Sequence, residues 1–101
     1  MSELYSWLST QPHGLRTYKS LKQKLIAQSS ADPEHAALFR LLGSIIDPYI
    51  ESFDEEPLPV YVADQVFARV LDIVRCAEDS VSRGAADQIR VLNKVAAVEL
   101  I

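Results

Sequence analysis

The residues best suited to catalysis or metal binding in this chain are two histidines and one cysteine, which lie far apart in the sequence. His13 belongs to a Pro-His-Gly turn, His35 lies in the first turn of a predicted helix, and Cys76 lies on the polar face of another. Zinc sites use Cys and His ligands at close spacing, and a cysteine nucleophile needs a base and an orienting third group. Neither pattern is found, so we expect no catalytic set, no metal site and no cofactor, and the sequence does not predict an enzyme.

Carboxylates form the most strongly charged segment. Residues 47–56 carry five negative charges and no positive one. This pattern fits a solvated helix end, or a contact for a basic partner surface, or a contact for the basic helix of another subunit. In the two binding interpretations the contact residues are Glu51, Asp54, Glu55 and Glu56.

The only basic segment is a predicted helix over residues 15–28. On a helical wheel Arg16, Lys19 and Lys22 form a slanting row, whereas Lys24 points away. A nucleic-acid-binding helix concentrates its cations on one exposed face, and non-specific binding depends on a basic excess. The formal net charge is −4, so we expect no nucleic-acid partner. The alternative function is that of a nucleic-acid-associated regulator, which would bind DNA or RNA through Arg16, Lys19 and Lys22.

Residues 60–82 form the central helix of the predicted fold. Their apolar side chains recur with the helical period over an arc of roughly 160°, and no Gly or Pro interrupts them. An arc this wide can contact several neighbouring helices. We expect Val70 and Val74 to be buried and Asp72 to face solvent, while Glu78 lies at the edge of the apolar arc.

Other helices are predicted over residues 33–53 and 85–98, together with a short one at the N-terminus. Asp32-Pro33-Glu34 is a strong start signal, because Asp caps helices and Pro suits the first helical position. Apolar spacing continues through Pro48, which predicts a kinked continuation; the alternative is a stop and a restart capped by Asp47. The predicted fold is an all-α bundle of four main helices plus the short N-terminal one, as one domain over residues 1–101.

The last predicted helix has two apolar faces. One contains Ile89, Leu92 and Ala96, and we expect it to pack on the central helix. The other would then be exposed, continuing into an apolar chain end. Because soluble monomers avoid such patches and a two-fold dimer covers them, we expect a homodimer. The predicted contact residues are Val91, Val95, Val98, Leu100 and Ile101.

Together these features favour a small protein-binding module, such as a regulator, an inhibitor, an immunity-type protein or an adaptor. No apolar run is long enough to span a membrane, the first residues do not resemble a secretion signal, and a single cysteine fits a reducing compartment. We therefore expect a cytoplasmic protein that does not contact membranes. A further alternative is small-ligand binding in a cavity lined by Trp7, Tyr18, Tyr49 or Phe53.

Overall fold

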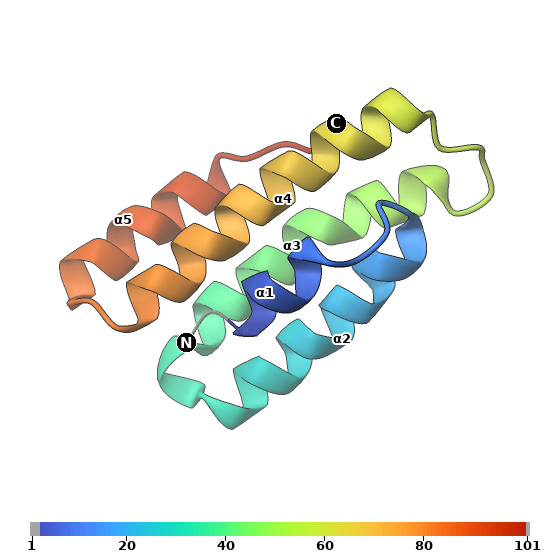
Figure 1. The fold of residues 1–101 in the computed structure, drawn as a ribbon. Helices are drawn as coiled ribbons and strands as arrows, with labels where there is room; N and C mark the ends of the chain where they lie inside the picture. Colours follow the sequence, from blue (N-terminus) through green and yellow to red (C-terminus); the bar gives the residue numbers. More distant parts are fainter. Residues whose placement is uncertain (1–2, 101) are drawn as a thin grey trace.

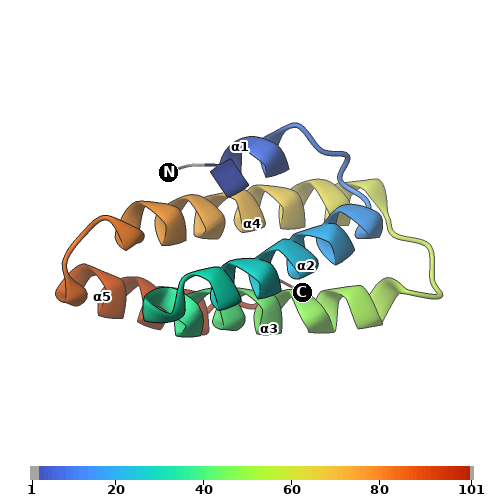
Figure 2. The same ribbon diagram turned by 90° about the horizontal axis from the view of Figure 1, so that it is seen from below.

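The computed structural model describes residues 3–100, and its regular structure is entirely helical. Long helices that follow one another run antiparallel (Figure 1). Figure 2 shows α1 on one side of α4 and α5 on the other. No strand occurs between residues 3 and 100, so the predicted all-α bundle is confirmed. In chain order the elements are α1 (Glu3–Ser9), α2 (Leu15–Ala31), the 3₁₀ helix η1 (Pro33–His35), α3 (Ala36–Phe53), α4 (Val60–Val81) and α5 (Ala85–Ala96).

The helix boundaries agree with most of the sequence signals. Pro33 begins η1, which leads directly into α3. The Asp32 carboxylate does not cap this helix; it lies 2.7 Å from Nδ1 of His35. The helix α3 continues through Pro48 as one element, so the predicted continuation is confirmed over a restart capped by Asp47, and the proline is exposed. The Ser52 hydroxyl donates a hydrogen bond of 2.8 Å to the Pro48 carbonyl.

The core lies where the apolar faces of α2, α3, α4 and α5 meet. Val70 and Val74 of α4 are both 0% exposed, which confirms the predicted inner face of this helix. Asp72 is partly exposed and pairs with Arg75 and Lys94. The helix α2 packs against α3 and makes no comparable contact with α4. None of the helices formed by residues 3–100 is long and apolar enough to cross a membrane.

Two buried tyrosines meet at the contact between α2 and α3. The rings of Tyr18 and Tyr49 are 5.2 Å apart at 87°, an edge-to-face geometry that aromatic pairs favour. Both residues are 0% exposed, and within the described chain neither hydroxyl has a hydrogen-bond partner. Burial raises the pKa of both hydroxyls, and the neighbouring Tyr49 adds to the increase for Tyr18. The pair therefore contributes ring packing at the cost of two unpaired polar atoms.

We predict that Tyr18→Phe and Tyr49→Phe each leave the free energy of unfolding unchanged or raise it by up to about 1 kcal/mol, because an unpartnered buried hydroxyl is a desolvation cost. Denaturant unfolding at neutral pH measures this. A loss of more than about 1 kcal/mol would show that the hydroxyl has a favourable partner.

The raised pKa values of the same two tyrosines predict that the protein loses stability at alkaline pH. An unfolded tyrosine ionises near pH 10, whereas Tyr18 and Tyr49 keep their protons to higher pH in the folded state. Their contribution is constant below pH 10 and decreases above it, by at most about 1.4 kcal/mol per pH unit for each tyrosine, until the pH reaches the folded-state pKa of that tyrosine. Unfolding curves between pH 9 and 11 should show a smaller loss in each Phe variant than in the wild type.

Candidate functional site

The acidic residues predicted to contact a partner lie at one end of the bundle, where α3 ends and α4 begins. Figure 1 shows the connecting segment projecting beyond both helices. Pro59 is extended (φ −61°, ψ 141°) immediately before the first residue of α4. A shallow hollow of about 490 Å³ lies beside the end of α3. Its exposed acidic residues are Glu51, Asp54, Glu55 and Glu56.

Two basic residues of α2 pair with acidic residues in and directly after α3 within the same chain. Lys19 Nζ lies 2.8 Å from the Asp54 carboxylate, and Lys22 pairs with Asp47. The sequence had suggested that the acidic segment could meet the basic helix of another subunit, but the structure shows this contact inside one chain. Arg16 is exposed. With Lys19 and Lys22 bound to carboxylates, the predicted row does not form an uncompensated cationic surface.

Three of the acidic residues keep their charge uncompensated. Among residues 3–100, no salt bridge involves Glu51, Glu55 or Glu56. The two most exposed large apolar residues of the described chain, Val60 and Tyr61, follow this segment at 75% and 69% exposure. We call residues 51–61 the acidic end. It combines unpaired negative charge with exposed apolar and aromatic surface.

The valine face predicted as a dimer contact is buried inside the chain. Val91 is 3% exposed and Val95 is 0% exposed, whereas Ile89, expected to pack inward, is 59% exposed. The assignment of the two faces was therefore wrong. The physical reason is that α5 packs against both α3 and α4, so the valines, which point between these two helices, enter the core.

The chain end after α5 is also covered. Leu100 is 6% exposed, and Val98 packs against the core. The guanidinium of Arg69 donates a hydrogen bond of 3.1 Å to the carbonyl of Glu99, which holds this segment against α4. The predicted exposure of this end was therefore wrong for Val98 and Leu100. Ile101 lies outside the described residues.

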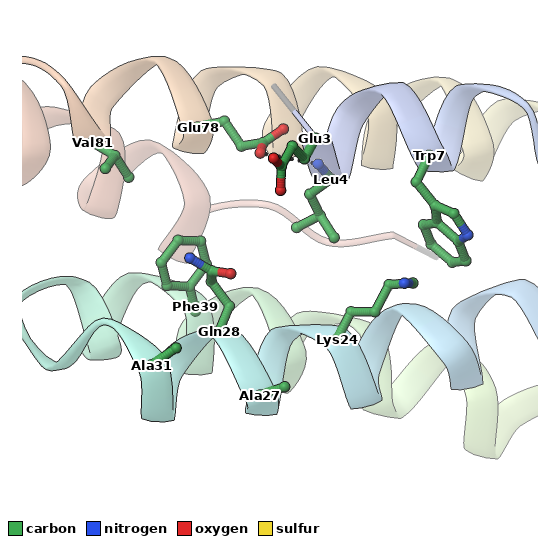
Figure 3. A pocket seen from close by; sticks show the side chains of 10 residues that line it. All are labelled: Glu3, Leu4, Trp7, Lys24, Ala27, Gln28, Ala31, Phe39, Glu78 and Val81. Atoms are coloured by element: carbon green, nitrogen blue, oxygen red, sulfur yellow. Dashed lines mark hydrogen bonds between the residues drawn. The ribbon is translucent and has the colours of Figure 1, made fainter. Parts of the chain in front are cut away.

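A second concavity lies beneath α1. The Glu78 carboxylate of α4 accepts hydrogen bonds from the backbone N–H groups of Leu4 (3.1 Å) and Tyr5 (2.7 Å), so it caps the first turn of α1. Below α1 a groove of about 590 Å³ separates α2 from α4. Figure 3 shows side chains of α1 and α4 facing those of α2 and α3 across this groove. One feature of the sequence points to this site: Glu78 lies at the edge of an apolar arc.

Of the four aromatic residues that the sequence offered as lining for a ligand cavity, Trp7 lines the groove beneath α1, whereas the other three lie in packed contacts. Tyr49 contacts both Tyr18 and Phe53, with ring centres 5.2 and 5.5 Å apart, so these three pack on one another. Trp7 instead lines the groove, where Lys24 Nζ lies 4.8 Å from its ring centre. The four aromatic residues therefore do not share one cavity.

Each histidine contacts an acidic residue. His13 Nδ1 lies 2.7 Å from Asp64, and its ring stacks on Phe67 at 3.8 Å. His35 lies beside Asp32 and Glu34, and potential ligand atoms of these three are within 4.8 Å of one another. This group was not expected from the sequence, in which only the two histidines and Cys76 were candidate ligands. Because Asp32 already contacts the His35 ring directly, the geometry is that of a local side-chain contact, and it supports no metal assignment.

The partly exposed thiol of Cys76 lies 3.3 Å from Lys94 Nζ. The cation beside this thiol therefore comes from α5, a different helix. The hydrogen bond to Cys76, followed by the charges of Cys76 and Asp72, raises the pKa of Lys94. The contact links α4 to α5, and the same Lys94 Nζ lies 3.4 Å from the Asp72 carboxylate.

Comparison of the chain with protein families, curated proteins and solved structures gives no significant match.

We predict that Val95→Glu unfolds the protein, because an unpaired buried charge costs several kcal/mol against a total stability of roughly 5–15 kcal/mol. Ile89→Glu, on the exposed side of the same helix, should change stability by less than about 1 kcal/mol. Thermal melting followed by circular dichroism distinguishes the two variants. A folded Val95→Glu variant with a destabilised Ile89→Glu variant would restore the original assignment of faces.

Proposed function

We propose that the protein is a protein-binding module that docks a basic, partly apolar partner surface on its acidic end. The observation that supports this most directly is the position of Val60 and Tyr61, exposed by 75% and 69%, next to glutamates that have no salt bridge among residues 3–100. Exposed tyrosines are frequent anchors in interfaces, and unpaired charge of one sign favours a partner of the other.

In this proposal the protein binds a partner without a cofactor and is not an enzyme. Its partner is a protein, so the regulator, inhibitor, immunity-type and adaptor roles all remain compatible with it. We place it in the cytoplasm, where a single cysteine such as Cys76 stays reduced. The pairing of Lys19 and Lys22 with carboxylates is an argument against nucleic acid as the partner.

Self-association is a separate proposal, and it needs a surface other than the valine face. Two acidic ends facing each other across a two-fold axis would place like charges together. Ile26 and Ile89, exposed by 52% and 59%, are the alternatives outside the acidic end. Light scattering at micromolar concentration would show a mass near twice 11.3 kDa if a dimer forms.

We predict that Tyr61→Ser and the double variant Glu55→Lys/Glu56→Lys each weaken partner binding by about tenfold or more, because they remove the aromatic anchor or reverse the local charge. Partners retained by the wild-type protein from the native host are identified by mass spectrometry. Their affinities for the wild type and the variants are then measured by calorimetry at two salt concentrations.

The matched control is Glu34→Lys/Asp79→Lys, which makes the same change in net charge at two exposed positions outside residues 51–61. It should bind the partner like the wild type. A partner that the acidic-end variants bind normally, or that the control variant loses, would contradict the proposed surface.

A further inference from the structure

The groove beneath α1 has the dimensions of a small-molecule site. Its volume of about 590 Å³ lies within the range of roughly 300–1,000 Å³ found for ligand pockets. Apolar surface comes from Leu4 and Trp7 of α1 and from Phe39 of α3. On α2 the wall is formed partly by Ala27 and Ala31, whose short side chains leave the space open. None of the residues that line this groove belongs to the acidic end.

The shape of the groove favours an elongated ligand. Figure 3 shows Trp7 and Lys24 towards one end of the row of lining side chains and Val81 and Phe39 towards the other. Leu4 lies between these two groups. A chain-like apolar body laid along this row would contact apolar side chains at both ends and in the middle.

The positive charge that the groove offers to a ligand is that of Lys24. Of the four lysines in the sequence, Lys19, Lys22 and Lys94 each have a carboxylate partner. For Lys24 the structure of residues 3–100 shows no salt bridge, only the approach of Nζ to the Trp7 ring at 4.8 Å. An ammonium group beside apolar surface and without a carboxylate is suited to a ligand anion.

The carboxylates of the groove limit where that anion can lie. Both oxygens of Glu78 already accept hydrogen bonds from the backbone of α1, and Glu3 lies next to Glu78 in Figure 3. These two carboxylates would repel a second negative charge near the middle of the groove. A ligand with one anionic group at the Lys24 end and a neutral body along the rest avoids this repulsion.

We infer that the groove binds an amphipathic monoanion, a carboxylate on an apolar chain, with its head on Lys24 and its chain running beneath Leu4 towards Phe39. This site is independent of the proposed protein-binding surface. The carboxylate forms a charge-assisted hydrogen bond with Nζ, and the chain removes apolar surface of Trp7 and Phe39 from water.

The experiment uses decanoate below its micelle concentration as the probe and compares it with decanol and decylamine, which have the same chain with a neutral and a cationic head. Because the protein has a single tryptophan, a change in its fluorescence reports binding at Trp7. Calorimetry measures affinity, and we expect a dissociation constant on the order of 100 µM for decanoate. Decanol and decylamine should bind at least about tenfold more weakly.

Two pairs of variants locate the site. Lys24→Met should weaken decanoate binding about tenfold and leave decanol binding unchanged, whereas Lys22→Met, which alters a lysine outside the groove, should have no effect. Ala27→Leu should abolish binding by filling the groove. Ala86→Leu, at an exposed position of α5 outside the groove, should leave binding unchanged. Circular dichroism checks that each variant is folded.

The inference is supported if decanoate binds with the fluorescence change and both pairs of variants behave as described. It is overturned if decanoate does not bind at millimolar concentration, if the three probes bind equally, or if Lys24→Met and Ala27→Leu bind like the wild type. Because the acidic end is intact in all these variants, none of these outcomes depends on the proposed partner.

Discussion

The packing of α2 against α3 is the constraint on which both candidate sites depend. It buries Tyr18 against Tyr49 and brings Lys19 and Lys22 beside Asp54 and Asp47. The helix α2 packs against α3 and makes no comparable contact with α4. The space left between α2 and α4 is the groove, and the acids left unpaired at the end of α3 form the acidic end.

A second interaction turns that space into a bounded groove. The helix α1 has only seven residues, too few to be stable alone. Glu78 satisfies two of its N-terminal N–H groups, and Leu8 is 0% exposed beneath it. The position of Trp7 above Lys24 follows from this anchoring. A carboxylate that is nearly 75 residues away in sequence therefore decides where the only tryptophan lies.

The sequence predicted those features that depend on local periodicity and failed where the outcome depends on tertiary contacts. Val70 and Val74 could be assigned because the apolar arc of α4 has a single centre. The helix α5 has two apolar stripes of similar strength, and the choice between Val95 and Ile89 is made by α3 and α4, which spacing within α5 does not encode. The Glu78 cap and the pairing of Lys22 with Asp47 join distant segments and could not be derived from either segment alone.

The distribution of charge explains why the two sites are chemically distinct in a chain of net charge −4. Pairing of Lys22 with Asp47 and of Lys19 with Asp54 neutralises these two carboxylates, and along residues 47–56 of the described chain it reaches no further than Asp54. Glu55 and Glu56 lie beyond that limit and set the potential of the acidic end. Lys24 lies on the side of α2 that faces α1, away from the acids of α3. Within residues 3–100 its ammonium group therefore has no carboxylate partner and faces the groove. The three lysines of α2 thus separate into Lys19 and Lys22, which pair with carboxylates, and Lys24, which faces the groove. This separation leaves unpaired negative charge at the acidic end and places an unpaired ammonium group at one end of the groove.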